Sequence, residues 1–488
     1  PENCIQCNRC AYVCPHAVIR PVALTAEEAA NAPEGMKTLD LTGMKEYKFT
    51  MSVSALDCTG CGSCVNVCPG KKGAKALAME NLEASENEQK YFDYTVKLPI
   101  KEDVIAKFKE ATVKGSQFKQ PLLEFSGACA GCGETPYAKL ITQLFGDRMY
   151  IANATGCSSI WGNSSPSTPY TVNAKGQGPA WSNSLFEDNA EFGYGMLLAQ
   201  RAIRDGLKAK VEDVVANGTN EDVKAAGQEW LDTFAVGATN GAATDKLVAA
   251  LEACGCDKAK EILAQKDFLA KKSQWIFGGD GWAYDIGFGG VDHVLASGRD
   301  INVMVFDTEV YSNTGGQSSK STPTGAIAQF AAGGKETKKK DMASIAMSYG
   351  YVYVAQISMG ADFNQTVKAI AEAEAYPGPS LIIAYAPCIN HGIKKGMAKA
   401  QTEEELAVKV GYWHNFRFNP AAEGNKFSLD SKAPSMEDYQ AFLDGEVRYN
   451  SLKRQNPEKA ARLFAKNEAE AKARFEYLQK LIALHSAE

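Results

Sequence analysis

Residues 4–15 read Cys-Ile-Gln-Cys-Asn-Arg-Cys-Ala-Tyr-Val-Cys-Pro, and residues 58–69 read Cys-Thr-Gly-Cys-Gly-Ser-Cys-Val-Asn-Val-Cys-Pro. In both stretches, three cysteines are separated from one another by two residues, and a fourth cysteine stands directly before a proline. The chain therefore contains an internal repeat, with some forty residues between its two copies. This cysteine pattern is typical of a site for two 4Fe–4S clusters.

In this pattern, the three closely spaced cysteines bind one cluster and the cysteine before proline binds the other. We therefore predict one cluster on Cys4, Cys7, Cys10 and Cys68, and a second on Cys58, Cys61, Cys64 and Cys14. A pair of structural zinc sites is the alternative, but zinc is usually bound by separate Cys-x-x-Cys pairs. The repeat thus predicts a ferredoxin-like α+β domain over residues 1–100 that transfers single electrons.

The overall composition suits a globular protein. Of 488 residues, 45% are hydrophobic and 23% are charged, and the net charge of −6 argues against a nucleic-acid-binding surface. No apolar run is long enough to cross a bilayer and no secretion signal is visible, so we expect a cytoplasmic protein with no membrane contact. The chain begins with Pro1 rather than Met, and a cluster ligand stands at position 4. We therefore expect it to be a piece of a longer polypeptide.

From about residue 101 the pattern changes to α/β. Five short apolar runs predict buried strands at 149–152, 274–277, 301–306, 351–355 and 380–385. Helix-forming stretches separate them, which favours a parallel sheet in a domain over residues 101–488. Residues 199–270 are almost all helix-forming and predict a helical insertion, and a charged helix is expected from Pro457 to Leu484.

Unusual residues follow four of these strands, namely Cys157, Asp280, Thr308 and Cys388. Ligands of open parallel sheets bind beyond the carboxyl ends of the strands, so we expect one site at this edge. Gly279 and Gly281 flank Asp280, where glycine lets the main chain approach a diphosphate closely. One aspartate with neutral oxygens suits Mg²⁺ shared with phosphates. We predict that Asp280, Thr308 and the Val310 carbonyl bind the metal.

The segment from Gly278 to Gln317 resembles the thiamine-diphosphate motif, in which Gly-Asp-Gly is followed some thirty residues later by an Asn-bearing turn. Thr308 stands where many such enzymes have asparagine, and its hydroxyl can still bind magnesium. Four further cysteines near the same edge can hold a third 4Fe–4S cluster: Cys129, Cys132, Cys157 and Cys388. Zinc bound with the help of His391 is the alternative. Cys254 and Cys256 lie at a helix end and are interpreted as buried structural thiols, with cluster binding as the less favoured hypothesis.

Two ferredoxin clusters, a third cluster and a thiamine site on one chain resemble the C-terminal portion of the single-chain pyruvate:ferredoxin (flavodoxin) oxidoreductases. The resemblance covers essentially the whole chain and rests on the two repeats and on residues 127–134, 154–159, 279–287, 307–317 and 386–392. It implies that Cys129, Cys132, Cys157 and Cys388 hold a proximal cluster. It also implies that Glu134, Cys157 and Trp282 border the thiamine site and that Asn313 reaches the substrate as a catalytic residue.

The same resemblance implies a reversible reaction in which pyruvate and coenzyme A give acetyl-CoA and CO₂. Electrons are expected to pass singly through three 4Fe–4S clusters to ferredoxin or flavodoxin, in a homodimer of anaerobic metabolism. The glutamate that activates the aminopyrimidine ring, and much of the pyruvate and coenzyme A binding, are expected upstream of Pro1. The fragment alone should therefore bind clusters but turn over little pyruvate.

Three rival hypotheses remain open from the sequence. The chain could act on another 2-oxoacid such as 2-oxoglutarate, since residues for substrate choice are expected mostly upstream. It could be an electron-transfer module with a vestigial thiamine loop. It could also be a non-redox decarboxylase whose clusters are structural.

Overall fold

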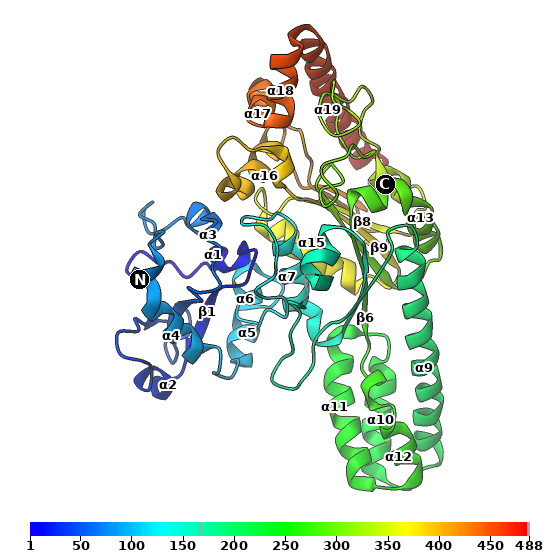
Figure 1. Ribbon diagram of the computed structural model, residues 1–488. Coiled ribbons are helices and arrows are strands. Elements are labelled where there is room, and N and C mark those ends of the chain that lie inside the picture. Colours follow the sequence, from blue (N-terminus) through cyan, green and yellow to red (C-terminus); the bar gives the residue numbers. More distant parts are fainter. Residues whose placement is uncertain (165–166, 486–488) are drawn as a thin grey trace.

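The computed structural model describes residues 1–164 and 167–485. Figure 1 shows a small N-terminal module, a central α/β body and a bundle of helices that projects away from the body. The predicted class, an α+β cluster module before a mainly parallel α/β domain, is confirmed by the topology of the two sheets. The boundary at residue 100 stays a prediction.

The N-terminal module is built on a three-stranded antiparallel sheet in the order β1 (Ile19–Leu24), β3 (Lys48–Val53), β2 (Leu39–Asp40). Each cysteine repeat forms a loop followed by a short helix, α1 (Arg9–Tyr12) or α3 (Ser63–Val67). Both helices start after a left-handed residue, Asn8 at φ 59° or Gly62 at φ 77°. These residues turn the main chain sharply between consecutive cysteines. The other helices of this part are α2 (Ala26–Ala30), α4 (Glu86–Thr95), α5 (Glu102–Phe108) and α6 (Val113–Ser116).

The body contains an eight-stranded sheet in the order β11–β10–β8–β9–β7–β6–β4–β5. Six strands pair in parallel: β4 (Met149–Ala154), β5 (Ala180–Ser184), β6 (Ser273–Gly279), β7 (Ile301–Asp307), β8 (Tyr353–Ile357) and β9 (Pro379–Tyr385). The antiparallel edge is formed by β10 (Phe416–Phe418) and β11 (Phe427–Leu429). All five predicted strands are therefore present, although β8 starts two residues later than the predicted run. Strands β5, β10 and β11 were not predicted.

Helices cover both faces of this sheet, and the alternation of side chains along each strand divides the core in two. Residues such as Ile276, Val303 and Ile383 pack with α9 (Asn189–Asn217), α13 (Phe288–Ala296) and α14 (Met342–Met347). Their neighbours Phe277, Met304 and Ile382 pack with α7 (Thr135–Phe145) and α15 (Phe363–Ala375). Burial on both faces explains why β7 and β9 read as unbroken apolar runs.

The N-terminal module docks on the second of these faces through α1. Tyr12 is fully buried in that core, and its hydroxyl donates a hydrogen bond to the carbonyl of Phe363 at 3.0 Å. Lys139 of α7 is buried as well, and its ammonium donates to the carbonyls of Ala11 and Tyr12. A buried lysine that satisfies two main-chain acceptors fixes the cysteine loop against α7.

The helical insertion comprises α9, α10 (Glu221–Thr233), α11 (Gly237–Cys254) and α12 (Asp257–Leu263), and it has its own core around Trp230 and Leu247. Its first helix starts at Asn189, ten residues before the predicted start at residue 199. These first turns of α9 pack on the sheet, and the rest of the helix belongs to the bundle. A Cβ added to Gly193 would lie 2.6 Å from the side chain of Ile276, so glycine is required for this close approach. Figure 1 shows the rest of the bundle extending beyond the sheet.

The C-terminal part adds α16 (Ala400–Lys409), α17 (Tyr439–Asp444), α18 (Val447–Gln455) and α19 (Pro457–Leu484). Helix α19 has the predicted limits: the Asn456 side chain caps its first turn and Pro457 occupies its first position. Within the described residues, no helix is both long enough and apolar enough to span a membrane.

Candidate functional site

The first group of cysteines consists of Cys4, Cys7 and Cys10 of the first repeat and Cys68 of the second repeat. Burial raises the pKa of the Cys4 thiol, and the nearby Cys7 and Cys68 raise it further. Burial also raises the pKa of the Cys10 thiol, with further contributions from Cys64 of the second repeat and from Cys7 and Cys4. The structure thus brings together the four cysteines predicted for one cluster, beside the cysteines predicted for the other.

The second group joins Cys58, Cys61 and Cys64 with Cys14. Burial raises the pKa of the Cys64 thiol to about 12, with further contributions from Cys14, Cys61 and Cys58. In residues 1–164 and 167–485, no three His, Cys, Asp or Glu side chains converge closely enough to hold one metal ion. The cysteines of a 4Fe–4S cluster need not converge on one metal ion, because each of them binds a separate iron atom.

The third group lies at the carboxyl edge of the large sheet. Cys157 follows β4 and starts the short helix α8 (Cys157–Ser159), Cys388 follows β9, and Cys132 precedes α7. Burial raises the pKa of all three thiols, that of Cys388 to about 11, and in each the Glu134 carboxylate contributes. Cys129 adjoins Cys388 and is exposed. Such thiols lose their protons readily only to a cationic metal centre, so the group fits a cluster.

Two glycines allow the Cys129–Cys132 loop to reach the Cys388 loop. A Cβ on Gly133 would lie 2.6 Å from the carbonyl oxygen of Pro387, the residue before Cys388. Gly131 has φ +76° and a similarly close main-chain neighbour at Met397. A side chain at Gly133 would push the two cysteine loops apart, and a side chain at Gly131 would collide with Met397.

His391 lies beside Cys388, but its ring nitrogens contact other groups than the thiols, against the zinc alternative. Its Nδ1 accepts a hydrogen bond from the main-chain N–H of Cys388 at 3.0 Å. Its Nε2 lies 3.8 Å from Glu309 Oε2, and the ring is fully buried.

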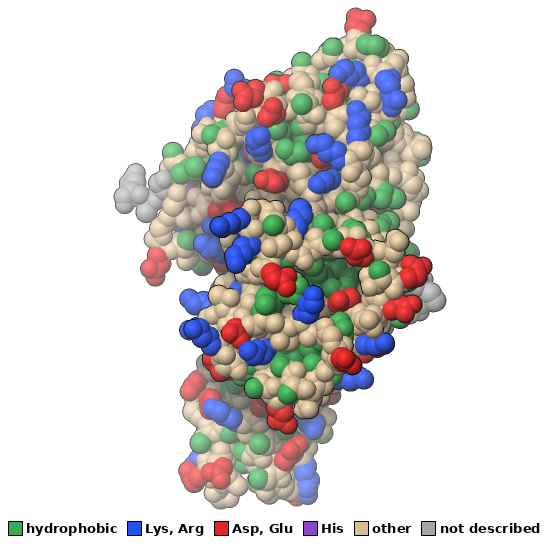
Figure 2. All heavy atoms as spheres, turned by 90° about the vertical axis from the view of Figure 1, so that its left-hand side faces the viewer, with side chains coloured by type: hydrophobic (Ala, Val, Ile, Leu, Met, Phe, Trp, Pro, Cys, Tyr) green, Lys and Arg blue, Asp and Glu red, His purple; other side chains and the backbone are tan. Residues whose placement is uncertain are grey.

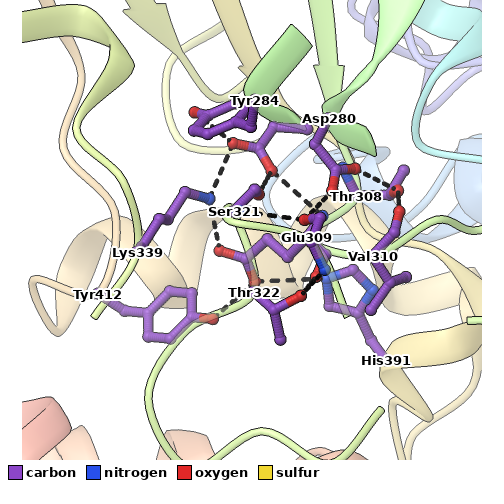
Figure 3. Close-up of polar contacts among 12 residues, drawn as sticks. Asp280, Tyr284, Thr308, Glu309, Val310, Ser321, Thr322, Lys339, His391 and Tyr412 are labelled. Carbon is purple, nitrogen blue, oxygen red and sulfur yellow. Dashed lines mark hydrogen bonds and ion pairs between the residues drawn. The ribbon is translucent and has the colours of Figure 1, made fainter. Parts of the chain in front are cut away.

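The predicted magnesium ligands converge at the ends of β6 and β7 (Figure 3). The Thr308 hydroxyl lies 3.0 Å from both Asp280 Oδ1 and the Val310 carbonyl oxygen. The single hydroxyl proton of Thr308 can be donated to only one of these two acceptors. The other oxygen is therefore left without a hydrogen-bond donor from this hydroxyl. Asp280 is fully buried, and its other oxygen accepts a hydrogen bond from Ser319 at 2.6 Å. A divalent cation would satisfy this oxygen set.

The glycines beside Asp280 make room for neighbouring aromatic rings. A Cβ on Gly281 would lie 2.4 Å from the Tyr311 ring, and one on Gly278 would lie 2.3 Å from the Trp282 ring. The Trp282 ring is therefore packed in the core. Because the ring is buried, only the main chain of Trp282 is available to contact a diphosphate. Gly281 opens a π-helical turn, Gly281–Ile286, directly after Asp280. No close neighbour constrains Gly279 in this way.

Glu134 and Asn313 occupy different environments at this edge. Glu134 is buried among the third cysteine group and accepts a hydrogen bond from Trp161 Nε1 at 2.8 Å. Burial raises the pKa of its carboxyl to about 7. Asn313 is exposed in the loop whose Ser312 lies 3.1 Å from Cys157 Sγ. That loop also carries Val310, so the predicted magnesium ligands and the third cysteine group adjoin.

A charge network lies behind the loop of the predicted magnesium ligands, and none of its charged residues was predicted from the sequence (Figure 3). Lys339 Nζ lies 2.8 Å from Asp307 Oδ2 and 3.0 Å from Glu309 Oε1, so one ammonium bridges the two carboxylates that flank Thr308. Arg448 lies 2.7 Å from Glu309 Oε2. Burial would raise the pKa of Glu309, but Lys339 and Arg448 hold it at about 2. Glu309 itself has φ 62°, an unusual conformation that these contacts hold in place.

A Lys339→Met substitution should destabilise the protein by about 3 kcal/mol, because it leaves Asp307 and Glu309 buried without their shared cation. The temperature of thermal unfolding, measured anaerobically with cofactors present, reports the loss. Lys338→Met, which changes an exposed neighbour, is the matched control. Equal unfolding temperatures for the two variants would contradict the role given to the network.

Fold and site together define a protein that combines an iron–sulfur dicluster with a thiamine-binding α/β domain. Two family models agree: "4Fe-4S dicluster domain" matches residues 3–72, and "Thiamine pyrophosphate enzyme, C-terminal TPP binding domain" matches residues 235–384. The chain is 58% identical over 491 residues to pyruvate-flavodoxin oxidoreductase of Enterobacter agglomerans, covering 98% of this chain and 41% of the relative.

Two further relatives give the same result. Identity is 58% to pyruvate:ferredoxin oxidoreductase of Moorella thermoacetica, over 99% of this chain and 42% of the relative. Identity is 55% to pyruvate-flavodoxin oxidoreductase of Klebsiella pneumoniae, over 99% of this chain and 41% of the relative. This chain is therefore similar to one portion of these pyruvate:ferredoxin/flavodoxin oxidoreductases, and it carries a dicluster domain and a thiamine pyrophosphate-binding domain. It spans about two fifths of the length of these relatives.

Proposed function

We propose that this chain supplies part of the thiamine site and the electron outlet of an enzyme that converts pyruvate and coenzyme A to acetyl-CoA and CO₂, and that can run in reverse. Its twelve patterned cysteines hold three 4Fe–4S clusters, and its electrons leave to ferredoxin or flavodoxin. The observation that best supports this proposal is the 3.1 Å contact between Cys157 Sγ and Ser312 Oγ. It joins the third cysteine group to the loop of the magnesium ligands.

The residues at the sheet edge have different roles in this proposal. Thiamine diphosphate, when bound, supplies a carbanion and then an electron sink. Asp280, the Thr308 hydroxyl and the Val310 carbonyl hold the Mg²⁺ that binds its diphosphate. Lys339 keeps the strand end that carries Thr308 in place through the carboxylates on either side. Asn313, in the exposed part of the same loop, contacts the substrate.

Helix α7 connects the third cysteine group to the dicluster module. It begins at Thr135, just after Cys132 and Glu134, and Lys139 holds the carbonyls of Ala11 and Tyr12. At a rise of 1.5 Å per residue, Thr135 and Lys139 are only about 6 Å apart along the helix, and Cys132 lies three residues before Thr135. Ala11 and Tyr12 lie between Cys10 and Cys14, so α7 holds one repeat close to the third group. This arrangement supports an electron path from the thiamine site through the third cluster to the dicluster.

The module's outer face suits a soluble carrier that binds briefly. Figure 2 shows both basic and acidic side chains there, with several Lys and Arg side chains grouped on the left of the face. Cys58 is exposed, which brings one predicted cluster close to the surface. The groups that activate the aminopyrimidine ring and bind coenzyme A are proposed to come from the part of the relatives' length that this chain does not span. A cytoplasmic homodimer is proposed on the same family basis.

The proposal is tested by adding pyruvate and coenzyme A to the anaerobic full-length enzyme and following the iron–sulfur absorption. We expect the absorption to bleach as the clusters are reduced. The 488-residue chain alone, with its cofactors, should form little or no acetyl-CoA.

Three results would contradict parts of this account. Acetyl-CoA formation by the isolated chain at the full-length rate would show that no further domain is needed. Bleaching with 2-oxoglutarate but not with pyruvate would identify another 2-oxoacid as the substrate. Decarboxylation without any bleaching would favour a non-redox enzyme with structural clusters.

A further inference from the structure

Two cysteines remain outside all three cluster groups. Cys254 is the last residue of α11 and Cys256 is the residue before α12, at the end of the helical insertion that lies away from the sheet (Figure 1). From the sequence, both were expected to be buried structural thiols. That interpretation is wrong, because Cys256 is exposed and Cys254 is only partly buried.

The two thiols face each other. The Cys254 S–H donates to the sulfur of Cys256, with the sulfur atoms 2.8 Å apart. This separation is within about 0.8 Å of the length of a disulfide bond, which is about 2.05 Å. The thiols can therefore be joined with only a small local movement.

Gly255 is the reason for this geometry. It has φ +60°, the left-handed conformation that ends α11 and reverses the chain between the two cysteines. An added Cβ would meet no atom within 4 Å, so space alone does not require glycine here. The requirement is conformational, since other residues adopt this φ at a cost.

The surroundings indicate which sulfur reacts first. The pKa of the Cys256 thiol is lowered, mainly by the hydrogen bond from Cys254 and then by one from the main-chain N–H of Ala259. A thiol with a lowered pKa and an exposed sulfur is the better nucleophile. Two thiols alone do not complete a tetrahedral zinc site, and the described residues offer no third His, Cys, Asp or Glu ligand there.

We propose that Cys254 and Cys256 are a redox-active dithiol that forms a reversible disulfide by exchange with a low-molecular-weight disulfide. The Cys256 thiolate attacks one sulfur of the disulfide, forms a mixed disulfide and releases one thiolate. The Cys254 thiolate then attacks the Cys256 sulfur, forms the Cys254–Cys256 bond and releases the second thiolate. Two protons leave the protein thiols, and two electrons pass to the small disulfide, which is reduced to two thiols.

This site would respond to the thiol–disulfide state of the cell separately from the one-electron clusters. A disulfide that spans a single residue closes a small ring, and strained exposed disulfides are the easily reduced ones. The pair therefore suits reversible exchange rather than permanent cross-linking.

The test uses the anaerobic full-length enzyme with its clusters and glutathione disulfide as the probe. After exposure to increasing ratios of glutathione disulfide to glutathione, free thiols are alkylated and the protein is digested with trypsin. Cleavage after Lys246 and Lys258 releases a peptide, residues 247–258, that contains both cysteines and no other. We expect loss of both alkyl labels and a mass lower by two hydrogens, reversed by dithiothreitol.

Two variants separate the steps. Cys254→Ser should stop at a mixed disulfide between Cys256 and glutathione, while Cys256→Ser should react more slowly at Cys254. Iron content should be unchanged in both, so the result does not depend on the proposed catalytic function. Peptides that keep both labels at every ratio, or wild-type protein that stays as a stable mixed disulfide, would overturn the proposal.

Discussion

Replacing Asp280 by alanine is expected to lower the affinity for thiamine diphosphate and Mg²⁺ by about 100-fold or more while the iron content stays unchanged. Asp280 is the one charged member of the oxygen set formed with Thr308 and Val310, and it is fully buried. Without it, only neutral oxygens remain for the cation that neutralises the diphosphate. Thiamine retained after gel filtration, together with iron analysis of the same sample, measures both effects.

Asp300→Ala is the matched control for this variant. Asp300 directly precedes β7 and pairs with Lys271 at 2.9 Å. The control substitution therefore removes the same charge at the opposite edge of the sheet, before the strand that neighbours β6. It should retain thiamine diphosphate at the wild-type level. An Asp280→Ala protein that still carries one thiamine diphosphate per chain would show that the magnesium site lies elsewhere.

A Cys388→Ser substitution should have the reverse effect, with loss of iron and retention of thiamine. If Cys388 is a ligand of the third cluster, iron should fall by about a third, from about twelve to about eight atoms per chain. In the full-length enzyme, pyruvate and coenzyme A should then no longer reduce the dicluster, because the path from the thiamine site is interrupted. Iron analysis and absorption spectroscopy check the two outcomes.

Cys256→Ser serves as the control, since it removes a thiol that belongs to no cluster group. Iron content and pyruvate-dependent bleaching should both match the wild type. Undiminished iron in Cys388→Ser, or full reduction of its dicluster by pyruvate, would remove Cys388 from the proposed relay.

The spacing of residues predicted those parts of the molecule that local chemistry determines. The two repeats place their cysteines in groups because each loop is short and turns at left-handed residues such as Asn8 and Gly62. Asp280 and Thr308 meet because each directly follows a buried parallel strand. Helix α19 was bounded correctly because Asn456 and Pro457 are strong signals for a helix start.

Other features depend on contacts that no local pattern contains. Lys339 and Arg448 lie 30 and 139 positions after Glu309, so nothing in the sequence pairs them. The consecutive polar residues Asp307, Thr308 and Glu309 at the end of an apolar strand were the available signal for that network. Strands β10 and β11 contain three residues each, too few for an alternating pattern to be recognised.

The central claim is that this chain carries three 4Fe–4S clusters beside one thiamine site. The most direct measurement is the iron, sulfide, zinc and thiamine content of the protein purified anaerobically. The account predicts about twelve irons, about twelve sulfides and one thiamine diphosphate per chain, with no stoichiometric zinc. About eight irons with one zinc, or full iron with no thiamine diphosphate even after it is added with Mg²⁺, would contradict it.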